Sequence, residues 1–124
     1  MVHRLCVLLL TGIVLLSSPV GGEEVYLVPI KGTIEKGLAA FVSRVIRDAE
    51  IQGVEAVVFD IDTPGGALDA ALNIRDAVLY SEVKTIAFVN PRAISAGALI
   101  SLAMTHIVMV EGGTIGAATA VDMQ

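Results

Sequence analysis

Residues 54–66 read VEAVVFDIDTPGG, and this stretch decides the expected fold. Val54 to Ile61 is too apolar for a strand with one face in water, so it predicts a buried strand of a parallel sheet. The segment DTPGG, residues 62–66, predicts a sharp loop because proline and adjacent glycines favour turns. Leucines spaced along residues 68–79 then predict a helix. A buried strand joined to a helix by a tight loop is typical of α/β proteins.

The segments on either side continue this alternation. Residues 25–30 predict a strand, and Pro29 indicates that it lies at an edge of the sheet. Apolar side chains at helical spacing from Leu38 to Ala49 predict an amphipathic helix, which Gly53 ends. Strands separated by helices predict an α/β domain with a largely parallel sheet. The remaining expected elements are a strand at 85–89, a helix at 95–104 and a strand at 106–110.

The first 22 residues have the layout of a secretory signal peptide. A short polar start precedes a mainly apolar run from Leu5 to Leu16, and a small, turn-prone segment follows. This run is short for a membrane-spanning helix, which needs about 20 residues. Cleavage would make Glu23 the new N-terminus, and an uncleaved signal anchor is the alternative. Either way we expect an exported protein, with residues 23–124 outside the cytoplasm.

Composition argues against several classes of function. The only cysteine, Cys6, lies in the apolar run, so residues 23–124 have no disulfide and no thiol nucleophile. The formal net charge is −5 and the chain has no cluster of Lys or Arg, so no nucleic-acid partner is expected. Asp60 and Asp62 share one strand face without a third ligand, so no metal site is expected. No glycine-rich loop ends in Gly-Lys-Ser/Thr, and no cofactor is expected.

Ser95 lies in the segment AISAGALISLA, residues 93–103, where the sequence predicts the start of a helix. A serine at this place is most often an N-cap, whose oxygen accepts from backbone N–H groups. The small neighbours Ala96, Gly97 and Ala98 also leave open space above the hydroxyl, which a nucleophilic serine requires. The residues by themselves leave both interpretations open.

The pair Gly65-Gly66 also has two interpretations. It can form a tight turn before a helix, or it can direct backbone N–H groups at a developing negative charge, as in an oxyanion hole.

No side chain stands out as a general base for Ser95. His106 opens an apolar strand, and the short helix before it is expected to carry it away from the serine. Burial can lower the pKa of a lysine enough for it to act as a base. The lysines at hand, Lys31, Lys36 and Lys84, have the pattern of ordinary solvated side chains.

Four segments in this order resemble the NfeD family, membrane-bound serine proteases of the ClpP class that are also similar to signal peptide peptidase A. The likeness covers about residues 24–120. The segments are VYLVPIKGTI (25–34), VVFDIDTPGG (57–66), AISAGALISLA (93–103) and GGTIGA (112–117).

The resemblance implies a ClpP/crotonase-like fold of repeated ββα units and a Ser-Lys dyad. Residues 23–124 would form a ClpP-like protease domain that is incomplete at its C-terminus. Ser95 matches the nucleophile. Gly66 and Ala96 match the N–H donors of the oxyanion hole, with Gly65 in the same motif. In the family the lysine follows the TIGA-like segment, whereas no lysine follows Ser95 in this chain.

The resemblance further implies a membrane-associated endopeptidase on the extracytoplasmic side that cleaves apolar or membrane-near protein substrates. A stomatin-like membrane protein is the expected partner, and a homo-oligomer is expected. Two other functions stay open. One is a crotonase-type enzyme acting on acyl-CoA, against which the export signal argues because CoA is a cytoplasmic cofactor. The other is a non-catalytic scaffold of the same fold that binds a membrane partner.

Overall fold

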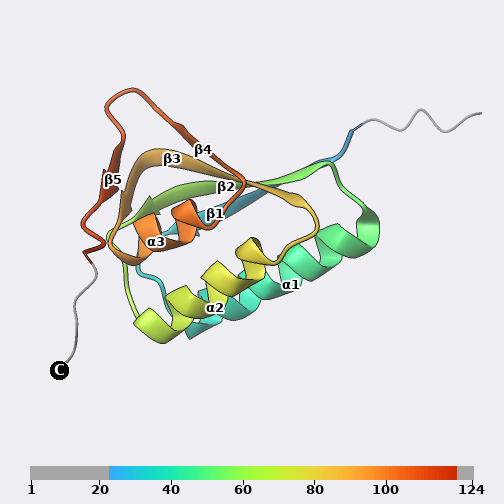
Figure 1. Cartoon of the computed structure of the whole chain (residues 1–124), viewed down its shortest axis with the longest axis horizontal. Coiled ribbons are helices and arrows are strands. Elements are labelled where there is room, and N and C mark those ends of the chain that lie inside the picture. Colours follow the sequence, from blue (N-terminus) through green and yellow to red (C-terminus); the bar gives the residue numbers. More distant parts are fainter. Residues whose placement is uncertain (1–22, 120–124) are drawn as a thin grey trace, which may run out of the picture.

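The structure, a computed structural model, describes residues 23–119, so the expected signal segment at residues 1–22 lies outside the described residues. Strands and helices alternate along most of this part of the chain (Figure 1). The elements are β1 (Val25–Lys31), α1 (Lys36–Gln52), β2 (Ala56–Thr63), α2 (Leu68–Leu79), β3 (Lys84–Ile94), α3 (Ala96–Leu102), β4 (His106–Met109) and β5 (Thr114–Gly116).

All strand pairs of the sheet are parallel, which confirms the expected α/β class. The strands follow the order β1-β2-β3-β4, and β5 pairs with β3. β1 pairs with β2 alone among the described strands, so Pro29 lies on an edge strand, as its missing N–H predicts. β4 and β5 pair with successive parts of β3, first residues 86–89 and then residues 92–94.

The three helices cover one face of the sheet. Because each crossover leads to the next strand in the same direction, right-handed connections place the helices together on that face. The core lies between the helices and the sheet, and its apolar side chains come from alternate positions of the strands. Its largest fully buried side chains include Phe59, Ile30, Ile34, Ile61, Ile74 and Ile100.

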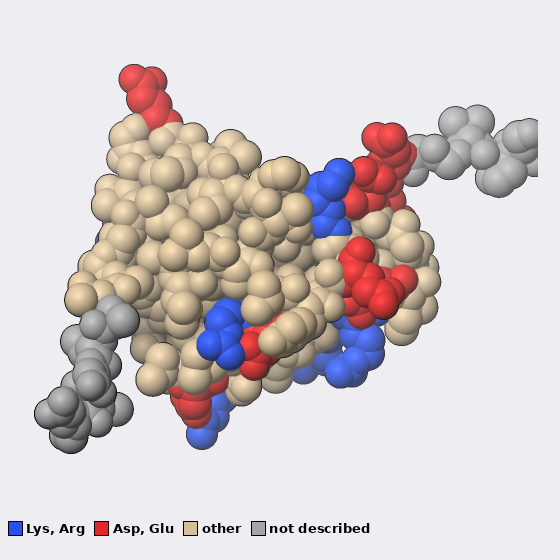
Figure 2. Space-filling view, in the orientation of Figure 1, with Lys and Arg blue, Asp and Glu red and all other residues tan. Residues whose placement is uncertain are grey.

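The other face of the sheet has no helix against it in the part of the chain that the structure describes (Figure 1). Leu27 is 71% exposed there, and all four residues of β4 are exposed. Figure 2 shows few charged side chains over the region of α3, β4 and β5. The exposed apolar side chains of α3 and β4 are Leu102, Ile107, Val108 and Met109.

The observed boundaries refine the sequence expectations. α1 ends where expected, because Gly53 adopts a left-handed conformation with φ 65° and its N–H donates to the carbonyls of Ala49 and Glu50. β3 is longer than predicted and continues past Pro91 to Ile94, where it pairs with β5. α3 is shorter than predicted and covers residues 96–102.

Candidate active site

Loops at the carboxyl ends of β1, β2 and β3 meet around Ser95. A Cβ built on Gly65 would lie 3.0 Å from Ser95 Cβ and 3.2 Å from the carbonyl oxygen of Ile94. Gly65 also has a φ of 108°, a backbone conformation that side chains rarely permit. Glycine is therefore required here because the PGG loop contacts the segment that carries Ser95. In parallel sheets this edge is the usual place for a site.

Ser95 has a strained backbone conformation and an exposed side chain. Its φ is 54° and its ψ is −116°, outside the regions that non-glycine residues ordinarily occupy. Its N–H donates to Gly116 O of β5 at 2.8 Å, which links the TIGA segment to the site. The residue occupies the N-cap position of α3, but its side chain makes no capping hydrogen bond. The hydroxyl of Ser95 therefore does not cap α3, contrary to the N-cap interpretation.

Two of the three candidate oxyanion donors have no acceptor among the described residues. The N–H groups of Gly66 and Ala96 make no hydrogen bond there, and Ala96 is the first residue of α3, where helices leave N–H groups unpaired. The N–H of Gly65 differs, because it donates to Thr63 Oγ1 at 3.0 Å. The geometry therefore narrows the candidate donors to Gly66 and Ala96. Gly65 instead allows the backbone of the PGG loop to lie close to Ser95.

Thr63 and the loop after β1 also belong to this site, although the sequence does not predict a role for either. Thr63 is fully buried, and its hydroxyl contacts both the PGG loop and Gly32. Ile34 forms an isolated parallel bridge with Gly66. In the sequence Thr63 is notable only because it directly precedes Pro64. That position does not show whether its hydroxyl holds the loop by hydrogen bonds or whether it is an ordinary β-branched strand residue.

No histidine or lysine of the described residues contacts Ser95. His106 is exposed at the start of β4 and pairs with Ile86, toward the opposite end of β3 from Ser95. The expectation that α3 separates the two residues is confirmed. The three lysines form ion pairs with carboxylates elsewhere: Lys31 with Asp60 at 2.7 Å, Lys36 with Asp69 at 3.5 Å and Lys84 with Glu55 at 3.2 Å.

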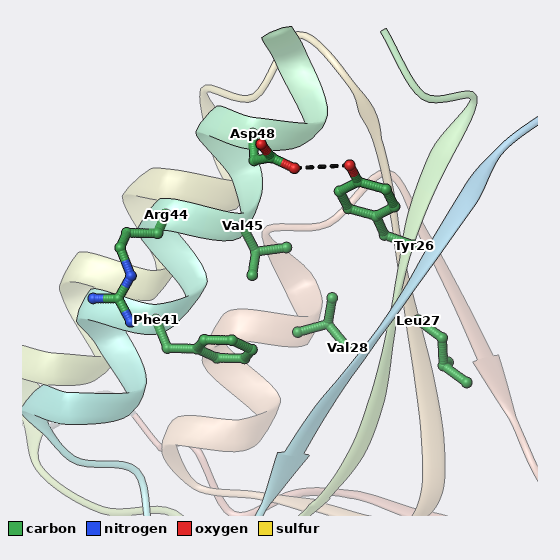
Figure 3. Close-up of a pocket in the computed structure, with 7 residues that line it drawn as sticks. All are labelled: Tyr26, Leu27, Val28, Phe41, Arg44, Val45 and Asp48. Atoms are coloured by element: carbon green, nitrogen blue, oxygen red, sulfur yellow. Dashed lines mark hydrogen bonds between the residues drawn. The ribbon is translucent and has the colours of Figure 1, made fainter. Parts of the chain in front are cut away.

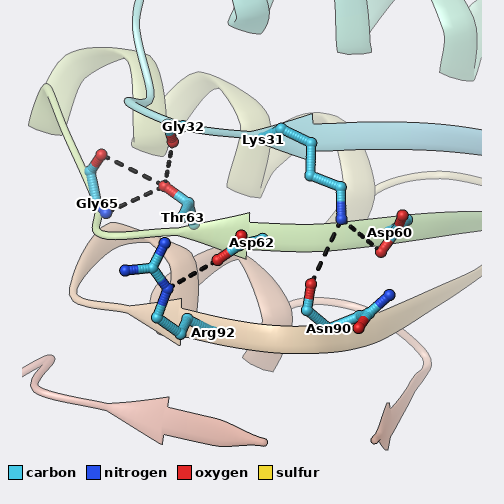
Figure 4. Close-up of polar contacts among 8 residues, drawn as sticks. All are labelled: Lys31, Gly32, Asp60, Asp62, Thr63, Gly65, Asn90 and Arg92. Atoms are coloured by element: carbon cyan, nitrogen blue, oxygen red, sulfur yellow. Dashed lines mark hydrogen bonds and ion pairs between the residues drawn. The ribbon is translucent and has the colours of Figure 1, made fainter.

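Two carboxylates near the site form ion pairs with cationic side chains on the open face of the sheet (Figure 4). Asp60 pairs with Lys31, and Asp62 accepts a hydrogen bond from Arg92 Nε at 2.8 Å. This hydrogen bond raises the pKa of Arg92. Within residues 23–119 no group of three or more His, Cys, Asp or Glu side chains is placed to hold a metal ion.

A separate hollow lies between β1 and α1 (Figure 3). Its volume is about 490 Å³, and none of its lining residues belongs to the loops around Ser95. Tyr26 donates a hydrogen bond to Asp48 there at 2.7 Å, which raises the pKa of the tyrosine hydroxyl. The lining residues are Tyr26, Leu27, Val28, Phe41, Arg44, Val45 and Asp48.

Comparison with known proteins identifies the family. The family model described as NfeD1b, N-terminal domain, matches residues 24–124. The chain belongs to this family. The expected membership of the NfeD family is thereby confirmed.

Two curated relatives are similar over most of this chain. The membrane protein NfeD1b of Bacillus subtilis (strain 168) is 43% identical over 102 residues, which are 82% of this chain and 23% of the relative. The membrane-bound protease PH1510 of Pyrococcus horikoshii is 37% identical over 109 residues, 85% of this chain and 25% of the relative. The chain thus spans about a quarter of the length of these relatives.

Solved structures confirm the ClpP-like fold of this NfeD domain. One is a lysine-to-alanine mutant of the 1510-N membrane-bound stomatin-specific protease in complex with a substrate peptide. It has a TM-score of 0.75 and 36% identity over 82% of this chain and 48% of its own. A serine-to-alanine mutant of the same protease has a TM-score of 0.73 and 36% identity over 78% of this chain and 48% of its own. ClpP1 of Listeria monocytogenes has a TM-score of 0.60 and 27% identity over 63% of this chain and 46% of its own.

Both curated relatives are named as membrane proteins or membrane-bound. Over residues 23–119 of this NfeD domain, none of the helices has the length and apolar character needed to span a bilayer.

Proposed function

We propose that this domain belongs to a membrane-associated serine endopeptidase in which Ser95 is the nucleophile. The observation that carries the proposal is the contact of the PGG loop with Ser95. That contact brings Gly65 against Ser95, an exposed residue whose side chain makes no capping hydrogen bond, and the N–H groups of the neighbouring Gly66 and Ala96 have no acceptor among the described residues. A nucleophile next to free N–H donors is the arrangement that acyl transfer requires.

In the proposed reaction Ser95 Oγ attacks a peptide carbonyl carbon. A C–O bond forms, and the carbonyl oxygen becomes an oxyanion that accepts hydrogen bonds from Gly66 and Ala96. The serine proton passes to a base and then to the leaving amine as the C–N bond breaks. Water then hydrolyses the acyl-enzyme and restores Ser95. Loss of one oxyanion donor is expected to slow such a reaction by about 10²–10³-fold.

The base is proposed to be a lysine outside these 124 residues. Residues 96–124 contain no lysine, and Lys31, Lys36 and Lys84 are engaged with carboxylates. The solved relatives in which a serine or a lysine was replaced by alanine support a Ser-Lys pair. Because general-base catalysis contributes about 10²–10⁴-fold, we expect the 124-residue chain alone to be inactive at neutral pH.

The proposed substrate is an apolar, membrane-near segment of a stomatin-like protein on the extracytoplasmic side. The solved 1510-N relative is described as stomatin-specific and binds a substrate peptide. The exposed apolar side chains of α3 and β4, which include Leu102, Ile107 and Val108, support an apolar ligand. The uncovered face of the sheet also supports the proposed self-association, because parallel sheets are ordinarily covered on both faces.

The test uses the gene beyond codon 124. If a lysine follows the TIGA segment, the longer product is expressed together with two variants, Ser95→Ala and the corresponding lysine-to-alanine change. We expect the longer product to cleave an apolar peptide from a stomatin-like protein, and both variants to lose that activity.

The same experiment separates the alternatives. A stop codon, or a longer product without cleavage, would contradict the protease and favour a scaffold. Hydrolysis of an acyl-CoA thioester that survives Ser95→Ala would favour a crotonase-type enzyme.

A further inference from the structure

Thr63 is a fully buried polar side chain that the proposed reaction does not use directly. The other buried polar side chains of the described residues are Thr85 and Ser101, and both have partners away from the loops around Ser95. Thr85 lies against Thr105, and Ser101 donates to Gly97 O within α3. The hydroxyl of Thr63 instead joins the end of β1 to the PGG loop (Figure 4).

The hydroxyl of Thr63 makes two strong hydrogen bonds. It donates to Gly32 O at 2.6 Å and accepts from the N–H of Gly65 at 3.0 Å. Gly65 O lies farther away, at 3.4 Å. Because a hydroxyl carries a single proton, the shorter contact with Gly32 takes it. The hydroxyl therefore occupies the amide of Gly65 and fixes the peptide before it.

The next peptide of the loop, which joins Gly65 to Gly66, is held by the loop after β1. The N–H of Ile34 donates to Gly65 O at 2.9 Å, and the N–H of Ala67 donates to Ile34 O at 2.9 Å. In a planar trans peptide the C=O and N–H groups point in opposite directions. The bond at Gly65 O therefore turns the N–H of Gly66 away from Ile34. Of the two glycine amides, only that of Gly66 is left to bind another group.

We propose that Thr63 is a positioning residue for the oxyanion site. Its hydroxyl holds the PGG loop in the orientation in which Gly65 is occupied and Gly66 is free to donate. This inference rests on the proposed function of Ser95. Thr63 itself lies beneath the loop and acts through Gly65 and Gly66.

A matched pair of variants in the 124-residue chain tests the role of the hydroxyl. Thr63→Val keeps the shape and removes the hydroxyl, whereas Thr63→Ser keeps the hydroxyl. The first readout is the rate constant for labelling of Ser95 by a fluorophosphonate at pH 9.5, where hydroxide replaces the protein base. We expect Thr63→Val to slow labelling by about 10- to 10²-fold and Thr63→Ser to stay within about threefold of the unchanged chain.

The second readout is hydrogen exchange at the amide of Gly65, followed by NMR. We expect slow exchange in the unchanged chain and in Thr63→Ser, and fast exchange in Thr63→Val. A role limited to stability would lower the thermal midpoint of Thr63→Val and leave the labelling of the folded protein unchanged. If Thr63→Val does not fold, Thr63→Cys, whose thiol bonds weakly, replaces it with the same expected direction.

The outcomes for the two proposals are distinct. Equal labelling rates in the unchanged chain and in folded Thr63→Val would overturn the positioning role and leave the nucleophile intact. Fast exchange of the Gly65 amide in the unchanged chain would overturn it as well. An unreactive Ser95 in the unchanged chain would instead overturn the proposed function, and the positioning role with it.

Discussion

Among single residues, two glycines allow close contacts around the site that a side chain would prevent. A Cβ on Gly66 would lie 2.1 Å from Ile34 O and 2.6 Å from Ile34 N, so only glycine allows the PGG loop to reach the loop after β1. A Cβ on Gly97 would lie 2.5 Å from Thr63 Cγ2, in the buried contact between α3 and the end of β2. The first contact is with rigid backbone and the second with a side-chain methyl, so the two glycines should respond differently to substitution.

Gly66→Ala is expected to destabilise the fold by about 1–3 kcal/mol, because backbone must move to admit the methyl group. The matched control is Gly37→Ala near the start of α1, where the nearest atom to a new Cβ is 3.6 Å away. Alanine favours helix over glycine by up to about 1 kcal/mol, so the control should be neutral or stabilising. Urea unfolding followed by circular dichroism measures both, and equal midpoints for the two variants would contradict the prediction.

Gly97→Ala is expected to be rescued by a second change at Thr63. Removing Cγ2 with Thr63→Ser takes away the atom that a Cβ at position 97 would meet, while the hydroxyl remains. The double variant should therefore be more stable than the sum of the single effects predicts, with a coupling energy of about 0.5–3 kcal/mol. A double-mutant cycle of unfolding free energies gives this quantity. Strict additivity would show that the two positions do not interact.

At the scale of elements, the strands and helices that the sequence predicted are those with a clear hydrophobic period. The apolar run before the PGG loop and the stripe of α1 carry their own signal, and the structure confirms both. The last part of β3 carries no such signal, because Pro91 and Arg92 are residues typical of a loop. It is a strand because β5 pairs with it through Arg92 and Thr114. Such a pairing depends on residues distant in sequence, which periodicity does not reveal.

The contact between β1 and α1 predicts a measurable titration. The hydroxyl of Tyr26 donates to the carboxylate of Asp48, and ionisation would break this bond and set two negative charges together, so its pKa is raised. Any stabilisation from this bond is therefore present below the ordinary pKa of about 10 and is lost as the pH rises through the folded pKa. In a Tyr80→Phe background, which leaves Tyr26 as the only tyrosine, absorbance at 295 nm should show a lower midpoint after Asp48→Asn. An unchanged midpoint would contradict the contact.

At the scale of the whole molecule, the site arises from the meeting of three loops that are far apart in sequence. The resemblance of the four ordered motifs to the NfeD family predicts Ser95, Gly66 and Ala96 as candidate residues of one site. The sequence did not show that Thr63 occupies the amide of Gly65, because that bond depends on how the end of β1 packs against β2. It also did not show which lysines are paired, since each ion pair joins different elements or loops.

Ser95 is proposed to lie in an environment that stabilises an oxyanion, and fluorophosphonate labelling of the 124-residue chain tests this proposal. Mass spectrometry compares Ser95 with Ser43 of α1 in the same sample, and Ser95→Ala is the control. We predict little labelling at pH 7.5. The rate at Ser95 should rise about tenfold per pH unit as hydroxide ionises the hydroxyl, and reach at least about tenfold that at Ser43 by pH 9.5. Equal labelling of Ser95 and Ser43 at pH 9.5 would contradict the claim.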